Sequence, residues 1–275
     1  MRFGLHIEPT ERTMDLRDLG RLLEERGFES LWLPEHTHLP VRGTSVHPSG
    51  PQVHDRLRRF LDPLIGLTAV AAVTERLLLG TGVCLVPEHD PIVLAKQVAT
   101  LDALSGGRVL LGVGAGWNRE ELRNHGVDPA TRWRVLRERV LAMKEIWTQD
   151  EAEFHGEFVD FAPLWQWPKP ARKPHPPVLV GGEGPRVLDR VLDYGDEWAP
   201  NDEPGVVERI PELQRRAAAR GRAPIPVTLM HVAPNPDLLR RYEAAGVARC
   251  VFSLSGGGAA EVRPAVARPA DLVAA

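Results

Sequence analysis

Histidine and glycine residues at the ends of apolar runs carry the chemistry that this sequence can offer. His36 follows Glu35 at the end of the run GFESLWLPEH, and together with His38 it forms an H-x-H pair. An imidazole donates or accepts a proton near neutral pH, which makes His36 the candidate catalytic residue. A histidine that is satisfied by backbone hydrogen bonds is the alternative interpretation.

The same histidines raise the question of a metal site. His6 lies in the first apolar run and His231 follows the run VTLM, so that with His36 and His38 they could ligate a divalent cation, as in barrel hydrolases. Neither a lysine nor a clear aspartate at the end of a predicted strand completes such a site. We therefore expect no metal, and metal-dependent hydrolysis is a secondary hypothesis.

A glycine-rich turn follows the apolar run PPVLV. Its residues are Gly181, Gly182, Glu183, Gly184 and Pro185, and a helical pattern begins directly after them. Small residues allow a sharp turn with several N–H groups directed at an anion, and a helix N-terminus favours negative charge. We interpret the turn as a phosphate site, with a tight structural connection as the alternative.

A second glycine series, Gly112, Gly114 and Gly116, matches a dinucleotide-binding fingerprint only in part. The third glycine comes too early for G-x-G-x-x-G, and no acidic residue ends a following strand about 20 residues later, as ribose recognition requires. We therefore assign Gly114 and Gly116 to the end of a strand that borders the site.

The segment from Leu77 to Asn118 predicts the unit that positions these residues. LLLGTGVCLV and RVLLGVG are continuous apolar runs, as is typical of strands that are covered on both faces in a parallel sheet. Between them Pro91 begins an amphipathic helix, which Gly106 and Gly107 end. The segment is thus a strand–helix–strand unit.

The same alternation extends along the whole chain. Strands are predicted at residues 1–7, 27–36, 77–86, 108–114, 177–180, 196–199, 227–230 and 249–254, with helices between them. Strands that alternate with helices, without a linker or a break in composition, predict an α/β fold, a (β/α)8 TIM barrel with inserted loops, as one domain over residues 1–275. A doubly wound sheet with a small appendage is the alternative.

Three segments fall outside this alternation. Residues 37–60 form a long loop rich in proline, glycine and histidine, for which we expect a lid or a mobile segment. Residues 154–173 predict a short hairpin and an aromatic, proline-rich connection. Pro264 and Pro269 leave room for only a broken final helix in residues 256–275.

Composition narrows the class of function. The 275 residues carry a net charge of −3, which gives no reason to expect nucleic acid as a partner. No run reaches the roughly 18 apolar residues of a membrane span, and no apolar signal segment precedes the first predicted strand. Cys84 and Cys250 lie within strand-like runs, so a disulfide framework is not expected. We expect a cytoplasmic enzyme that acts on a small molecule.

Four motifs give the chain a resemblance to a known family. They are GFESLWLPEH, LGTGVCLVPEHDPIVLAKQVATLDALSGGRVLLGVGAGWNREEL, FHGEFVDF followed by PKP, and PPVLVGGEGPRVLDRVLDYGDEWAP. Over roughly residues 3–253 the chain resembles the luciferase-like monooxygenase superfamily, and most of all its bacterial oxidoreductases that use the deazaflavin coenzyme F420.

The resemblance implies a barrel, often a homodimer, whose flavin or deazaflavin lies across the C-terminal mouth of the strands. It places the cofactor phosphate at residues 181–185 and His36 close to the reactive ring. It also implies a non-prolyl cis peptide at Gly82-Val83, which supports the back of the ring. The residues expected at the cofactor are His6, Gly82, Val83, Cys84, Gly114, Gly116, Gly181, Gly182, Glu183, Gly184 and Pro185.

One position departs from the family pattern. In relatives that oxidise sugar phosphates, a glutamate follows the glycines that here end at Gly116, and this sequence has Trp117 and Asn118 in its place. The sequence therefore speaks against a sugar-phosphate dehydrogenase. We expect Trp117 and Asn118 to shape the substrate pocket, with simple packing of Trp117 as the alternative.

The function that the resemblance implies is an F420-dependent oxidoreductase, which transfers a hydride between C5 of the deazaflavin and a small organic substrate. His36 would transfer a proton or orient the substrate. The first alternative is a reduced-FMN-dependent monooxygenase on the same scaffold. A flavin-binding protein without turnover is a further one.

Overall fold

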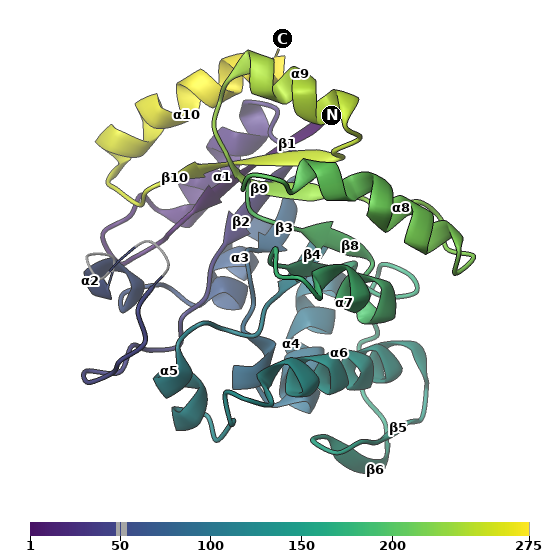
Figure 1. The fold of residues 1–275 in the computed structure, drawn as a ribbon. Helices are drawn as coiled ribbons and strands as arrows, with labels where there is room; N and C mark the ends of the chain where they lie inside the picture. The colour runs from purple at the N-terminus through teal and green to yellow at the C-terminus, as the bar shows by residue number, and fades with distance from the viewer. Residues whose placement is uncertain (48–49, 51–53, 275) are drawn as a thin grey trace.

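The computed structural model, which describes residues 1–47, 50 and 54–274, contains a barrel of eight parallel strands (Figure 1). They are β1 (Arg2–Ile7), β2 (Ser30–Leu33), β3 (Leu78–Thr81), β4 (Val109–Val113), β7 (Val178–Gly181), β8 (Glu197–Ala199), β9 (Thr228–Val232) and β10 (Arg249–Leu254). The sheet order is β8-β7-β4-β3-β2-β1-β10-β9. Parallel bridges from Trp198 to Val227 and from Asn201 to Met230 join β8 to β9. The predicted barrel is confirmed, and the doubly wound alternative is wrong.

A helix follows each barrel strand along the chain and covers the outside of the barrel (Figure 1). The helices are α1 (Leu16–Glu25), α3 (Pro63–Ala71), α4 (Pro91–Leu104), α6 (Arg132–Thr148), α7 (Val187–Tyr194), α8 (Ile210–Ala218), α9 (Pro236–Ala244) and α10 (Ala259–Ala274). Side chains of Asp15, Asp62, Asp90 and Asn235 cap four of them by accepting backbone N–H groups. Within the described part of the chain, no helix is both long and apolar enough to cross a membrane.

Large buried side chains fill the interior of the barrel. One buried cluster contains Trp32, Leu110, Leu179, Ala199, Met230 and Val251, which come from six different strands. A Cβ atom added at Gly80 would lie 2.3 Å from the Trp32 ring, so only glycine at this position leaves room for the indole. Because side chains occupy the interior, a ligand of the barrel would lie at the mouth where the strands end.

Short elements lie in the connections. The predicted hairpin is confirmed as β5 (Ala152–His155) and β6 (Asp160–Leu164), which pair antiparallel. The long loop 37–60 contains α2 (His54–Leu57), while its residues 48, 49 and 51–53 lie outside the described part, so the lid stays a prediction. Short helix α5 (Arg119–Asn124) follows β4, and 3-10 turns η2 (Val86–Glu88) and η3 (Val207–Arg209) precede α4 and α8.

The prediction of a broken final helix is wrong. Helix α10 runs without interruption over Ala259–Ala274, although Pro264 and Pro269 lie inside it. Val262, Val266 and Ala270 recur every four residues and are buried against the barrel. Burial of this apolar stripe compensates for the two missing backbone N–H donors, which is how tertiary packing overrides a local preference.

A buried arginine ties the N-terminal ends of four strands together. The Arg249 guanidinium at the start of β10 donates to Glu29 before β2, to Thr228 in β9 at 2.7 Å and to Glu197 in β8 at 3.4 Å. Its second hydrogen bond to Glu29 measures 3.0 Å. Arg249 is 1% exposed, so its charge depends on these two carboxylates for compensation.

We expect Arg249→Met to lower the free energy of unfolding by about 3–5 kcal/mol, because two carboxylates lose a buried cation. The control is Arg2→Met, which removes a more exposed arginine that pairs with the same Glu29 at 3.1 Å and should cost less than about 1 kcal/mol. Urea denaturation of both variants measures the difference. Equal losses would contradict the structural role of Arg249.

Candidate active site

A cavity of about 610 Å³ opens at the C-terminal ends of the barrel strands. Its size lies in the range of small-molecule and cofactor sites. Ten of the residues singled out in the sequence line it, namely His6, His36, Gly82, Val83, Gly114, Gly116, Trp117, Gly181, Gly182 and His231. The structure therefore brings both the histidines and the glycine turn to one cavity.

Other predicted residues lie beside the cavity and do not line it. Cys84 is fully buried behind the wall. The Asn118 side chain accepts from the N–H groups of Glu120 and Glu121, both at 3.1 Å, and thereby caps α5. His38 bonds to Thr37 and Asn124 outside the cavity. Glu183, Gly184 and Pro185 continue the turn away from the cavity wall.

The wall formed by β3, β4 and β7 is closely packed around Val83. The peptide between Gly82 and Val83 is cis, as the sequence analysis predicted. A Cβ atom added at Gly114 would lie 2.5 Å from Val83 Cγ2, and one added at Gly181 would lie 3.2 Å from Val83 Cγ1. These glycines therefore give the Val83 side chain its room, and they leave a smooth wall at the level of the cavity.

The glycine turn fits an anion. Gly182 has a φ of 101°, and an added Cβ at Gly182 or Gly184 would meet nothing within 4 Å. No described protein acceptor takes a hydrogen bond from the backbone N–H groups of Gly182 and Gly184, while the Glu183 N–H interacts with its own carboxylate. These donors precede the N-terminus of α7, where negative charge is favoured.

Two neighbours hold this turn from its outer side. The Glu183 carboxylate accepts from the Asn201 N–H at 2.5 Å, and the Arg209 guanidinium donates to the carbonyl oxygens of Glu183 and Gly184 at 2.6 and 3.4 Å. Arg209 is not recognisable as a functional residue in the sequence, because one arginine within a helical pattern carries no distinctive signal. Its bonds leave the N–H groups of the turn available for a phosphate.

His36 is fixed by hydrogen bonds at both ring nitrogens. Its Nδ1 lies 2.7 Å from Glu121 Oε2, and Trp117 Nε1 donates to its Nε2 at 3.2 Å. Because Nε2 accepts, the neutral ring carries its proton on Nδ1 and donates it to Glu121. Glu121 also accepts from the Thr37 N–H at 3.1 Å. The arrangement makes Nε2 a proton acceptor at the cavity.

Glu121 was not among the predicted site residues. It lies on α5, which was not predicted, and it is 1% exposed. The pattern Asn118-x-x-Glu121 is a possible helix-start signal, because an asparagine favours the N-cap position and a glutamate is common three residues later. That signal indicates a helix and says nothing about a histidine 85 residues earlier in the chain.

Another buried glutamate, Glu88, lies near the His36–Glu121 pair. Burial, and then the charges of Glu121 and Glu35, raise the pKa of Glu88 to about 9. Thr37 Oγ1 donates to Glu88 at 3.4 Å, and His125 Nε2 lies 3.6 Å from the same carboxyl oxygen. At neutral pH Glu88 therefore holds a proton, which removes a negative charge from the surroundings of Glu121.

His6 and His231 form a second histidine pair at the cavity. Their ring centroids lie 4.8 Å apart, and His231 Nδ1 lies 2.6 Å from Ser253 Oγ. Burial, and then His231, lower the pKa of His6 to about 3, so its ring is neutral. His6 Nε2 is buried without a hydrogen-bond partner among the described residues. A bound polar group at this wall would satisfy it.

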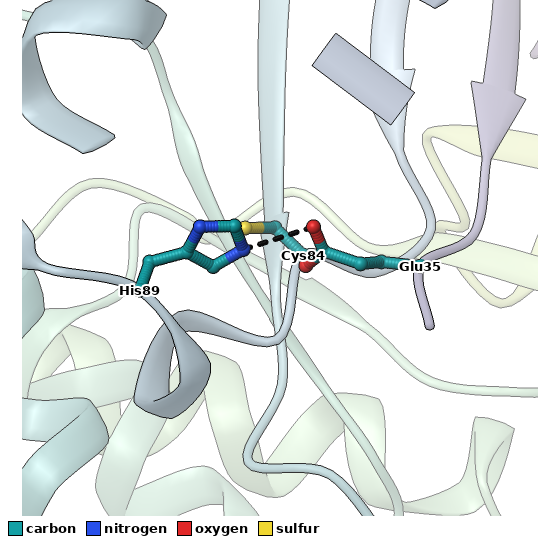
Figure 2. Close-up of side chains that lie close together, drawn as sticks. All are labelled: Glu35, Cys84 and His89. Carbon is teal, nitrogen blue, oxygen red and sulfur yellow. Dashed lines mark hydrogen bonds and ion pairs between the residues drawn. The ribbon is translucent and has the colours of Figure 1, made fainter. Parts of the chain in front are cut away.

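The predicted histidine set does not converge on a metal position. Within the described residues, one group has ligand atoms within 4.8 Å of one another, and it consists of Glu35, Cys84 and His89 (Figure 2). Glu35 accepts from the Leu85 N–H at 2.6 Å and from His89 Nε2 at 2.9 Å. These bonds engage both carboxylate oxygens and join the end of β2 to the loop after β3. We interpret the group as the support that positions the adjacent His36.

Comparison with known proteins shows one family. A family model described as luciferase-like monooxygenase matches residues 1–250. An uncharacterised protein of Mycobacterium tuberculosis is 42% identical over 100% of this chain and 99% of its own length. An FMNH2-dependent dimethylsulfone monooxygenase of Pseudomonas putida is 34% identical over 56% of this chain and 44% of its own length. An F420-dependent glucose-6-phosphate dehydrogenase of Kineococcus radiotolerans is 31% identical over 75% and 59%.

Solved structures share the fold. Monooxygenase RslO1 from Streptomyces bottropensis superposes with a TM-score of 0.74 at 19% identity, covering 100% of this chain and 97% of its own. An F420-dependent secondary alcohol dehydrogenase in complex with an F420-acetone adduct has a TM-score of 0.73 at 19% identity, with coverage of 92% and 93%. At this identity the likeness concerns the barrel architecture.

Glu88→Gln should make stability less dependent on pH. The pKa of Glu88 rises from 4.5 to about 9 on folding, so the folded protein holds more protons than the unfolded chain between these values. The free energy of unfolding therefore falls as pH rises through this range. The neutral amide of the variant does not titrate, so this loss of stability is absent. We expect the free energy of unfolding of the variant to exceed that of the parent by about 1 kcal/mol or more at pH 9. The difference should shrink towards pH 4.5.

The control is Glu120→Gln, whose effect has the opposite sign. Hydrogen bonds from Ser45 and Thr44 lower the pKa of Glu120 to about 2, so its charged form stabilises the folded state above the ordinary pKa of 4.5. Glu120→Gln should therefore be less stable than the parent at pH 9. Urea denaturation at pH 5, 7 and 9 measures both variants, and a Glu88→Gln protein less stable than the parent at pH 9 would contradict the protonated state of Glu88.

Proposed function

Because the chain belongs to the luciferase-like monooxygenase family, we propose that it is an F420-dependent oxidoreductase, which transfers a hydride between C5 of the deazaflavin and a small organic substrate. The observation that supports this proposal is one cavity lined both by His36, whose Nδ1 is held by Glu121, and by Gly181 and Gly182 of the glycine turn. An oxidoreductase that moves a hydride also needs a partner for the proton, and His36 meets that need.

The residues present fit a cofactor with a phosphate. The N–H groups of Gly182 and Gly184 would hold the phosphate, while Gly82 and Val83 would lie against the ring. His6 Nε2, buried without a described partner, would contact a polar atom of the ring system. When bound, the deazaflavin would supply the hydride acceptor and donor.

The protein's own task is to hold and move one proton. A substrate hydroxyl would take the place of the Trp117 N–H at His36 Nε2 and donate its proton there. Glu121, which holds Nδ1–H at 2.7 Å, would stabilise the imidazolium, and the reverse reaction would return the proton by the same route. Leu57, Phe60, Trp133 and Met230 give the cavity apolar walls that exclude water.

A reduced-FMN-dependent monooxygenase is the second candidate. The relative from Pseudomonas putida supports it, as the relative from Kineococcus radiotolerans supports the first. Both cofactors carry a phosphate, so the turn serves either. A paired binding experiment decides between them.

The homodimer stays a prediction from the family. Exposed apolar side chains on α3, α4 and the segment after β6 would offer a surface for a second copy. They are Ile65, Val93, Leu104, Trp165 and Trp167. The substrate stays undefined beyond a small organic molecule, as does the location of the protein in the cell.

Titration of the purified protein with F420 and with FMN, each oxidised and reduced, tests the cofactor. We expect F420 to bind with micromolar affinity and FMN at least about 10-fold more weakly, with fluorescence and calorimetry as measurements. Gly182→Val should weaken F420 binding at least about 10-fold, because a side chain would obstruct the turn at its positive φ.

Gly221→Val is the matched control. Gly221 also has a positive φ, 67°, with nothing within 4 Å of an added Cβ, but it lies in the turn after α8 and does not line the cavity. The Gly221→Val variant should lose backbone conformational stability much as Gly182→Val does, and it should bind F420 like the parent. A preference for FMN would transfer the protein to the oxygen-using monooxygenases.

His36→Ala tests whether His36 transfers the proton. With a substrate found by screening, turnover should fall about 10²–10⁴-fold, because the general acid–base is lost, while F420 affinity stays within a few-fold of the parent. Stopped-flow absorbance of F420 reduction measures turnover. Unchanged turnover would reduce His36 to a packing residue.

A further inference from the structure

Two arginines, Arg190 and Arg132, lie over Trp133, and the charges of two more, Arg186 and Arg119, act on them. Trp133 lines the cavity at the start of α6, and the Arg190 guanidinium of α7 lies 3.6 Å from the centroid of its ring. Arg132 lies 5.6 Å from the same ring. Arg186 directly follows the turn, and its positive charge and that of Arg132 lower the pKa of Arg190. The positive charge of Arg119 likewise lowers the pKa of Arg132.

Within the described part of the chain, these arginines are not paired with carboxylates. No described acidic side chain forms an ion pair with Arg119, Arg132, Arg186 or Arg190, and Arg132 Nε is buried without a partner. The two acids of α7 are engaged elsewhere, since Asp189 pairs with Arg216 and Asp193 with Arg137 at 2.6 Å.

Overall charge does not explain this gathering. The protein has a net charge of −3, so the cluster is a local feature and not the result of a basic chain. Stacking on Trp133 accounts for Arg190 and Arg132, but not for Arg186 or Arg119. Burial, together with the charges of Arg186 and Arg132, lowers the pKa of Arg190, and such mutual repulsion is relieved when an anion binds.

We propose that this arginine cluster binds carboxylates on a chain that continues beyond the phosphate of the cofactor. The inference rests on the proposed function and deepens it. Arginine suits carboxylates because its planar guanidinium donates two parallel hydrogen bonds. Coenzyme F420 carries glutamyl carboxylates beyond its phosphate, whereas FMN ends at the phosphate. The cluster begins at Arg186, one residue after the turn, which is where such a chain would emerge.

The test compares F420 that carries two or more glutamates with its precursor that has the phosphate and lactyl group but no glutamate. By fluorescence titration at low salt, the parent protein should bind the glutamylated form at least about 10-fold more tightly. In Arg186→Gln/Arg190→Gln that ratio should fall to near one, while affinity for the precursor changes little. Added salt should reduce the ratio in the parent.

Two further variants keep the test decisive. If the double variant folds poorly, Arg186→Gln alone provides the test, because it changes an exposed residue. In this variant the affinity ratio of the two forms should fall part of the way towards one. Arg215→Gln/Arg220→Gln removes two exposed arginines at and beyond the end of α8, away from the cavity, and should keep the parent ratio. Equal affinity of both forms for the parent, or equal weakening of both in the Arg186 variants, would overturn the inference and leave F420 dependence intact. Binding of neither form would overturn both.

Discussion

The hydrogen bond between His36 and Glu121 is the interaction on which the candidate chemistry depends. It spans 85 residues of sequence and joins the end of β2 to α5. It fixes the proton of the neutral imidazole on Nδ1, so that Nε2 faces the cavity as an acceptor. Two neighbouring interactions hold its ends in place. Asn118 caps the helix that carries Glu121, and the Glu35–His89 hydrogen bond fixes the residue before His36.

Charge is distributed unevenly over this site. Glu35, Glu88 and Glu121 lie buried on the side of His36, and Glu88 stays protonated because burial, and then the charges of Glu121 and Glu35, raise its pKa. The arginine cluster lies on the other side, beside the glycine turn. A ligand with one anionic end would therefore enter with that end towards the turn and its uncharged ring towards His36, so that orientation follows from electrostatics before any specific contact forms.

Much of the fold follows from the sequence, since strands of a parallel barrel are buried on both faces and appear as continuous apolar runs. His36 and the glycine turn could be found in the same way, because active sites of such barrels lie where the strands end. Glu121 and Arg209 could not, because their roles arise from residues that are distant in sequence and adjacent only after folding. The final helix was wrongly predicted because the burial of Val262, Val266 and Ala270 outweighs the local effect of two prolines.

The choice between deazaflavin and flavin does not depend on the parts of the site that the family shares. The barrel, the smooth wall at Val83 and the phosphate turn suit both cofactors, which explains why relatives named for each are similar to this chain. The two molecules differ in the chain beyond the phosphate, and specificity arises where a protein contacts such a difference. In this protein the chain beyond the phosphate would contact Arg186, Arg190 and Arg132, whose charges have no described carboxylate partner. Recognition of the anionic chain, more than of the ring, would then decide which cofactor the barrel holds.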